Sequence, residues 1–319
     1  PNLCSRNNAF SREILALLAF GAKIGKRSLV HLLKIYKARC VPTATYGAGL
    51  WGVSPSKILE TSENKFLKKL LAVPQGTCSY TCHCELGIVP IIDLIQIAPV
   101  LLWWKVWTSD EAVLNRKILV DCLALDHAKK IPWIACVSRF FSALGRPDLF
   151  TTPENLNDVG KKTLRTWCSD FLQESRLRSH DKMSSFNSYL LIYEHIGLQP
   201  YLTFVESPFQ RFLLIRFRLG LVYRCVSTPT PNNWSRVLPP CCCDNLSQQN
   251  MIHLMFFCDF YRVPRSKILK PLLLLLDIHS CTLTLLHLQR LETALECFTI
   301  YTYLCQVLKI RKSLLPGSF

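Results

Sequence analysis

The sequence predicts a mainly α-helical protein, built as an irregular assembly of several helices. Half of its 319 residues are hydrophobic, which is enough to form a buried core and excludes a solvated disordered tail. Only 12 residues are glycine and 19% are charged, a composition that favours helices over a loop-rich β fold. In several segments the apolar residues also recur at helical spacing.

Three helices are expected in the N-terminal part of the chain. Helical patterns cover residues 11–22, 28–40 and 55–71. The segment between the second and third patterns, residues 42–52, contains three glycines. We expect these glycines where helices pack closely or where the backbone turns.

The rest of the chain predicts further helices separated by loops rich in glycine and proline. The expected helices cover residues 86–107, 111–125, 157–177 and 209–222, and leucine-rich helices follow up to the C-terminus. The first of these segments is the most apolar in a chain whose mean hydropathy is +0.20. Two prolines and two charged residues interrupt it, so we expect a buried helix and no membrane span.

The charge of the chain points to a polyanionic partner. Its 38 Lys and Arg residues against 22 Asp and Glu residues give a net charge of +16, which favours nucleic acid ahead of an acidic membrane. Residues 14–59 and 207–243 contain no acidic residue at all. The candidate phosphate contacts in these two stretches are Lys23, Lys26, Arg27, Lys34, Lys37, Arg39, Arg211, Arg216, Arg218, Arg224 and Arg236. A solvated helix face is the alternative interpretation of the same cations.

Motifs of the common enzyme classes are missing. The segment Gly21-Ala-Lys-Ile-Gly25-Lys26-Arg27-Ser28 has three residues between its glycines, whereas a phosphate-binding loop has four. No Tyr-x-Asp-Asp occurs, so the paired carboxylates that hold catalytic Mg²⁺ in a polymerase are absent from the sequence. We therefore name no catalytic residue and expect no enzymatic activity from this chain by itself.

A Cys/His cluster near the C-terminus is the strongest candidate site. Cys241, Cys243, His253 and Cys258 form the pattern C-x-C-x9-H-x4-C. Zinc prefers four tetrahedral ligands of the thiolate and imidazole type, and such a site can order loops that do not fold alone. Cys242 is an alternative ligand in place of Cys241 or Cys243. Buried free cysteines are the alternative interpretation of the whole pattern.

Other cysteines give less specific signals. Cys78, Cys82, His83 and Cys84 are crowded into seven residues, too short a segment to surround a tetrahedral ion without other ligands. The chain has 16 cysteines without the spacing of a small secreted scaffold, and its start lacks the apolar region of a secretory signal. We therefore expect an intracellular, reducing environment.

Four blocks follow one another along the chain. They are Leu32-Leu33-Lys34-Ile35-Tyr36 with residues 42–52, the lysine-rich segment 60–74, the segment Glu85-Leu86-Gly87-Ile88-Val89-Pro90, and the Cys/His cluster followed by Phe260-Tyr261-Arg262 and Arg265. In this order they resemble the C-terminal region of the reverse transcriptases of LINE-type non-LTR retrotransposons. In that family the corresponding blocks run from the segment after the palm, through the thumb helix, to a C-terminal zinc knuckle.

The resemblance implies three consecutive regions. Residues 1–76 would form thumb-like helices, residues 77–228 a helical linker, and residues 229–319 a small Cys3His zinc knuckle with C-terminal helices. The implied cofactor is a structural zinc ion on Cys241, Cys243, His253 and Cys258. The implied partners are RNA and DNA, which the C-terminal part of such a transposable element helps to hold during target-primed reverse transcription.

The family's fingers, palm and endonuclease have no counterpart in this sequence. We therefore expect a fragment, which begins with Pro1, and an upstream polymerase domain in a full-length element that works in the cytoplasm and nucleus. The alternative is a non-catalytic helical interaction protein or a decayed retrotransposon remnant. Its motivation is the leucine-rich segment 272–308, which is a possible docking surface.

Overall fold

The mainly α-helical prediction is confirmed. The computed structural model describes residues 3–24, 29–52, 57–125, 131–180, 189–193, 197–205, 207–221, 241, 243, 250–276 and 280–314. Within these ranges the regular elements are all helices, and strand-like pairing is limited to an isolated antiparallel bridge between Leu86 and Leu198.

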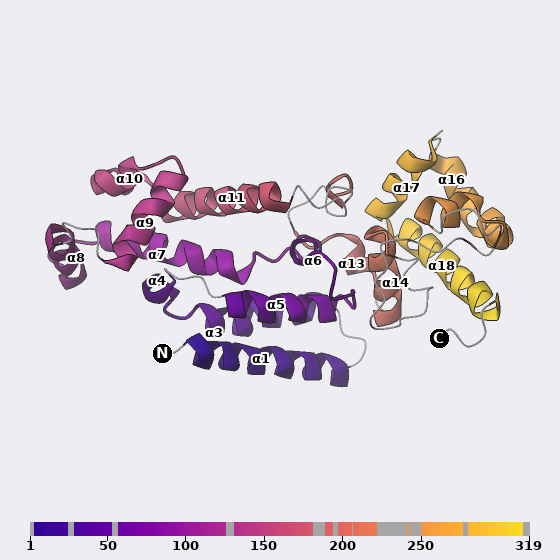
Figure 1. The fold of residues 1–319 in the computed structure, drawn as a ribbon, viewed down its shortest axis with the longest axis horizontal. Coiled ribbons are helices and arrows are strands. Elements are labelled where there is room, and N and C mark those ends of the chain that lie inside the picture. The colour runs from indigo at the N-terminus through magenta and orange to yellow at the C-terminus, as the bar shows by residue number, and fades with distance from the viewer. Residues whose placement is uncertain are drawn as a thin grey trace. The chain divides into compact units, whose positions relative to one another are not determined.

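Figure 1 shows the helices in chain order. The N-terminal elements are α1 (Leu3–Ile24), α2 (Leu29–Ile35), η1 (Tyr36–Cys40), α3 (Val41–Thr45), α4 (Ala48–Trp51), α5 (Lys57–Leu70) and α6 (Ser79–Leu86). The central elements are α7 (Ile91–Trp107), α8 (Leu114–Leu125), α9 (Pro132–Ala143), α10 (Asp148–Thr151), η2 (Pro153–Asp158) and α11 (Lys161–His180). The C-terminal elements are α13 (Tyr201–Phe204), α14 (Pro208–Arg218), η4 (His253–Phe257), η5 (Asp259–Tyr261), α15 (Arg262–Pro264), η6 (Arg265–Leu269), α16 (Lys270–Leu276), α17 (Cys281–Arg290) and α18 (Ala294–Leu314).

The chain divides into two compact units that are not consecutive in sequence. The first contains residues 1–20, 33–66 and 89–184, and the second contains residues 21–32, 67–88 and 185–319. This division differs from the three consecutive regions 1–76, 77–228 and 229–319 that the resemblance implies. A physical reason is that Glu85, in residues 67–88, bonds to Tyr201 and Arg218 of C-terminal helices, as described below.

Helix α7 forms the centre of the first unit. Helices α3, α4, α9 and α11 all pack against it, so it is surrounded by protein and its sequence is apolar on most sides. Trp103 on this helix is completely buried and packs against the rings of Trp107, Trp133 and Phe150. Within the described ranges no single helix is long and apolar enough to cross a membrane, although α6 and α7 taken as a bent pair reach the required length and composition.

Gly49 and Gly52 permit close helix packing, one of the two roles that the sequence analysis left open for the glycines of residues 42–52. A Cβ atom added to Gly52 would lie 2.5 Å from the carbonyl oxygens of both Ala48 and Ile95. One added to Gly49 would lie 3.1 Å from the side chain of Leu102. Helix α4 therefore approaches α7 at backbone distance, which a residue with a side chain would prevent.

The predicted bounds of α5 are close to the observed ones, and the predicted C-terminal ends of α7 and α8 coincide with the observed ends. Other boundaries differ from the predictions. Helix α1 starts at Leu3, well before the predicted residue 11. The helix predicted to end at residue 40 continues through α3, because the π-helical turn η1 accommodates Pro42, which has no N–H to donate. A regular α-helix is disfavoured by an internal proline, and this is why the sequence pattern suggested a break.

Helices α13, α14, α17 and α18 form the packed part of the second unit. Helix α18 contacts α13, α14 and η6, and α14 also contacts α17. The side chains of Phe217, Leu288 and Tyr303 are completely buried in this unit. The hydroxyl of Tyr303 also reaches the backbone of Leu254, in the turn that contains His253 of the Cys/His cluster.

Candidate metal centre

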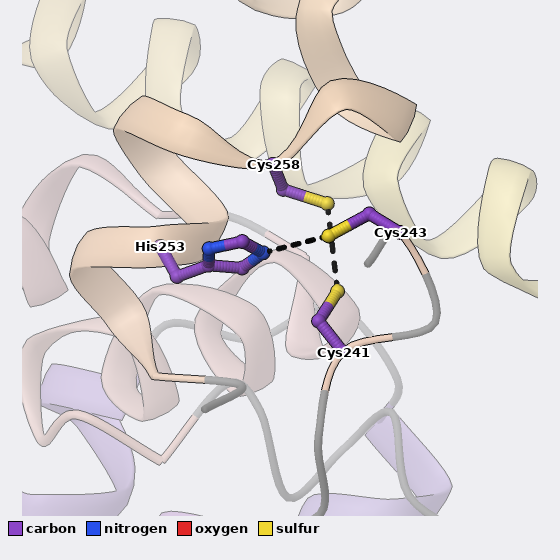
Figure 2. A group of neighbouring side chains, drawn as sticks. All are labelled: Cys241, Cys243, His253 and Cys258. Carbon is purple, nitrogen blue, oxygen red and sulfur yellow. Dashed lines mark hydrogen bonds between the residues drawn. The ribbon is translucent and has the colours of Figure 1, made fainter. Parts of the chain in front are cut away.

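The four predicted ligand residues of the Cys/His cluster meet at one point in the second unit (Figure 2). The Sγ atoms of Cys241 and Cys258 are 3.6 Å apart, and the Sγ atom of Cys243 is 3.2 Å from Nε2 of His253. All four potential ligand atoms lie within 4.8 Å of one another. Bonds of roughly 2.0–2.3 Å in a tetrahedral site place neighbouring ligand atoms roughly 3.3–3.8 Å apart. The cluster therefore has the size that a tetrahedral metal ion needs.

The spacing between His253 and Cys258 matches the local backbone. Residues 253–257 form the π-helical turn η4, and the backbone N–H of Cys258 donates to the carbonyl oxygen of His253 over 2.8 Å. A bond between residues five positions apart is the π-helical pattern, and it brings these two residues to the same side of the turn. Asn250 caps this segment, since its Oδ1 accepts a hydrogen bond of 2.8 Å from the His253 N–H.

Two side chains outside the cluster hold its backbone in place. The guanidinium of Arg265 donates to the carbonyl oxygen of Cys258 over 2.5 Å. The buried hydroxyl of Tyr303, on α18, donates to the carbonyl oxygen of Leu254 over 2.7 Å. The ligand-bearing turn is therefore attached to the helices behind it, which reduces the freedom of His253 and Cys258 to move apart.

The cluster lies in a largely dry environment. Cys241, His253 and Cys258 are buried, and Cys243 is half-buried. Burial, reinforced by hydrogen bonding with Cys241, raises the pKa of the Cys258 thiol to about 11, and it raises the pKa of Cys243 as well. These thiols are protonated at neutral pH in the absence of a cation, so metal binding must release protons. The group can hold a metal ion; Cys242, the alternative ligand, lies outside the described residues.

Polar side-chain atoms of Cys82 and His83, near residue 80, contact backbone carbonyl oxygens of the same segment. The thiol of Cys82 donates to the carbonyl oxygen of Cys78 over 3.7 Å, one helical turn away. Nδ1 of His83 lies 3.3 Å from the carbonyl oxygen of Ile88, and both residues are buried. These contacts belong to the end of α6 and the turn that follows it.

The cations of the first basic stretch lie partly on the surface. Lys34 and Lys37 are exposed on α2 and η1. Arg39 is also exposed, but its Nε is 2.7 Å from the carboxylate of Glu13, the acid that directly precedes the acid-free stretch. The charge of Arg39 is therefore partly offset. The side chain of Lys23 and the whole of Lys26 and Arg27 lie outside the described residues.

Arg218 does not lie on a nucleic-acid-binding surface, contrary to the prediction. It is 2% exposed and forms an ion pair with the completely buried Glu85, with 2.7 Å between Nε and Oε1. Its five N–H groups donate within the fold: to Glu85, to the carbonyl oxygens of Gln289, Arg290 and Ile192, and to Oε1 of Gln199. No donor of this guanidinium remains for a phosphate, so Arg218 supports the fold.

Glu85 completes this buried network from the other side. Its second carboxylate oxygen, Oε2, accepts a hydrogen bond of 2.6 Å from the hydroxyl of Tyr201, and its backbone carbonyl accepts one of 3.0 Å from the Gln199 N–H. The network joins the end of α6 to α13, α14 and the end of α17. Sequence reasoning missed it because Glu85 and Arg218 are 133 positions apart and no spacing rule connects them.

Two other arginines of the second basic stretch, Arg211 and Arg216, are also partly or fully buried. Arg211 is 8% exposed, and burial lowers the pKa of its guanidinium. Arg216 is half-buried, with its guanidinium 4.2 Å from the ring centre of Phe212 and a hydrogen bond of 3.3 Å to the carbonyl oxygen of Ala72. Arg224 and Arg236 lie outside the described residues. Within the described part of this stretch, only Arg216 remains partly accessible to a phosphate.

Comparison with known protein families, with curated proteins and with solved structures found no match to this chain. What the described residues show is a mainly helical protein with a Cys/His group that can hold a metal ion.

Proposed function

We propose that this chain is the nucleic-acid-binding C-terminal portion of a retrotransposon reverse transcriptase, and that its Cys/His cluster binds one structural zinc ion. The observation that carries the proposal is the convergence of Cys241, Cys243, His253 and Cys258, in the order and spacing that resemble the zinc knuckle of that family. Polymerisation in this proposal belongs to an upstream domain. The chain itself holds RNA template and target DNA.

The donor set supports zinc as the metal. Three thiolates and one imidazole are soft and borderline ligands, which suit zinc better than they suit magnesium or calcium. Four protein ligands leave no open position for a substrate, so the ion has a structural role. It joins the segment that carries Cys241 and Cys243 to the turn η4, which Tyr303 attaches to α18.

The zinc assignment is tested by metal analysis of the purified full chain. We expect one zinc ion per chain in the wild type and a clear loss in Cys243→Ser. Cys281→Ser is the matched control, because Cys281 is also half-buried but lies outside the cluster. Equal zinc content in the wild type and Cys243→Ser would remove Cys243 as a ligand.

Nucleic-acid binding is supported by the net charge of +16 and by the exposed Lys34 and Lys37. Contacts to phosphates release condensed counterions, so affinity falls steeply as salt rises. We expect the affinity for a single-stranded RNA to fall by at least tenfold from roughly 50 to 200 mM salt. An affinity that does not change with salt, or no binding at low salt, would contradict this function.

A second candidate function is that of a helical interaction protein. The observation that favours it is a set of exposed apolar side chains on α16, α17 and α18, namely Leu274, Leu283, Leu295 and Phe298. Sedimentation over a range of protein concentrations tests it in its simplest form, self-association. Concentration-dependent association that is abolished in Phe298→Asp supports this candidate, whereas a monomer that binds RNA tightly counts against it.

A further inference from the structure

An aromatic ring stands in solvent at the corner between α3 and α4. Tyr46 follows the last residue of α3 and is 77% exposed, although aromatic rings contribute most to stability when they are buried. Gly47 follows with φ of 66°, a left-handed conformation that turns the chain into α4. The turn carries the Tyr46 ring outward and away from the core of the first unit.

The surroundings of this ring are well fixed. The carbonyl oxygen of Tyr46 accepts a hydrogen bond of 2.9 Å from Nε1 of Trp51 and a second one from the guanidinium of Arg6. That guanidinium lies 4.9 Å from the ring centre of Trp51 and 5.8 Å from that of Tyr46, at cation–π distance from both. Glycine is favoured at position 47 by the left-handed φ of 66°, since a Cβ there would make only ordinary van der Waals contacts of 3.7–3.8 Å with Trp51 and Arg6. These contacts anchor the backbone of Tyr46, and Arg6 lies beside its ring.

An exposed aromatic ring with a cation beside it fits one class of ligand well. Bases of single-stranded nucleic acid stack on aromatic side chains, while their phosphates are attracted by nearby cations. Arg6 lies beside the ring, and the stretch in which Tyr46 lies, residues 14–59, contains no acidic residue. An apolar protein partner would gain no electrostatic attraction from this positive charge. In a double helix the bases are already stacked on one another and do not reach such a ring.

We infer that Tyr46 is a stacking site for an unpaired base of single-stranded nucleic acid, and that Arg6 is the residue that positions it. The inference rests on the proposed nucleic-acid-binding function, to which it adds the strandedness of the ligand and the point of base contact. Because the backbone of Tyr46 is anchored and Arg6 lies beside its ring, less conformational freedom is lost when a base stacks on it than for a ring on an unanchored loop.

The test compares Tyr46→Ala, Tyr46→Trp and the wild-type full chain. The probe is a single-stranded oligonucleotide that carries the fluorescent base 2-aminopurine, whose emission is quenched when it stacks. We expect Tyr46→Ala to raise the dissociation constant roughly 5- to 100-fold and to reduce the quenching, while Tyr46→Trp keeps both near the wild-type values. Leu50→Ala is the control, since Leu50 is 73% exposed in the adjacent helix α4 and cannot stack. It should leave both quantities unchanged.

A duplex of the same sequence supplies the second comparison. Affinity for the duplex should be equal in the wild type and Tyr46→Ala, because phosphate contacts are unaffected. If the wild type binds single strands with strong salt dependence and Tyr46→Ala binds them equally well, the inference is wrong and the proposed function stands. If the wild type binds no nucleic acid, the proposed function itself fails. Equal melting temperatures of the variants show that any loss of affinity is not caused by unfolding.

Discussion

The second unit contains two buried polar clusters that differ in how their members are distributed along the sequence. The outer cysteines of the Cys/His cluster are 17 positions apart, whereas Glu85 and Arg218 are 133 positions apart. Residue type and spacing were enough to predict the first cluster. The second exists only because the fold brings α6, α13, α14 and α17 together, so local patterns give no indication of it.

The burial of Arg218 changes how the positive net charge of the chain is interpreted. Arg218 and Lys34 contribute equally to the net charge of +16, yet Arg218 is neutralised by Glu85 inside the protein and Lys34 is exposed. A count of cations therefore overstates the surface that a polyanion can contact. Changes at the Cys/His cluster, at the Glu85–Arg218 network and at the exposed lysines should therefore affect metal binding, stability and nucleic-acid binding separately.

The largest expected effect is that of Arg218→Met. This substitution leaves Glu85 buried without its cation, and breaking a buried ion pair from one side costs about 3–5 kcal/mol. Urea unfolding should show this loss in the free energy of unfolding. Arg216→Met is the control, because Arg216 is half-buried and lies in the same helix, and its loss should stay below about 1 kcal/mol. Equal effects of the two substitutions would contradict the role of the network.

Removal of the proposed zinc ion is expected to have the next largest effect on the free energy of unfolding. Zinc that binds only the folded chain stabilises it by about 4 kcal/mol when its free concentration is about a thousandfold above the dissociation constant. We expect a chelator to lower the free energy of unfolding of the wild type by an amount of this order. The same treatment should have no effect on Cys258→Ser, which lacks a buried ligand from the start. Unchanged stability of the wild type after chelation would show that the cluster does not hold a structural ion.

A buried carboxylate in the first unit gives a smaller, pH-dependent effect. Glu63 is completely buried and accepts hydrogen bonds from two neutral donors, the Tyr36 hydroxyl at 2.5 Å and the Ile91 N–H at 2.9 Å. Burial is the main cause that raises the pKa of Glu63 from its ordinary value of 4.5 to about 7. Between these values the folded chain keeps a proton that the unfolded chain has released, so stability falls as pH rises through this window.

Glu63→Gln should remove this fall, because glutamine does not titrate. The difference between the unfolding free energies of the variant and the wild type should change by about 3 kcal/mol from pH 4.5 to pH 8, in favour of the variant at the higher pH. Urea unfolding at several pH values measures it. Parallel curves for the two proteins would show that Glu63 titrates in the same way in the folded and unfolded chains.

The smallest effect is expected from the exposed cations. Replacing both Lys34 and Lys37 by glutamine should reduce the slope of log affinity against log salt by about 0.7 for each phosphate of a single strand that the variant no longer neutralises. The stability of the protein should stay within about 0.5 kcal/mol of the wild type. Lys105→Gln, an exposed cation on α7 outside the acid-free stretch, is the control. A slope that the double substitution leaves unchanged would exclude these lysines from the interface.

Much of the local structure could be predicted from the sequence. The helical class and the position of α5 follow from periodicity. The glycines at positions 49 and 52 indicated close packing or a turn, but not that α7 is the helix approached. The four residues of the candidate metal centre were predicted from residue type and spacing. The four-residue interval between His253 and Cys258 also suits a π-helical turn, although the period of a regular α-helix does not indicate one.

The remainder depends on tertiary contacts. The extension of the second helix through Pro42 requires the π-helical turn η1, and the propensity of proline alone predicts a break. The burial of Arg218 and the grouping of residues 67–88 with the C-terminal helices depend on pairing over long sequence distances. No property of a single segment distinguishes a buried arginine of this kind from an exposed one.

Titration of the metal-free full chain with Co²⁺ tests the metal centre most directly, because cobalt reports the identity and geometry of its ligands by absorption. A tetrahedral site with three thiolates should saturate at one equivalent, with intense d–d bands and a thiolate-to-cobalt charge-transfer band. Both should be absent in Cys258→Ser and present in Cys281→Ser. A titration of the wild type that shows neither band would contradict the assignment of Cys241, Cys243, His253 and Cys258 as the ligands of a metal ion.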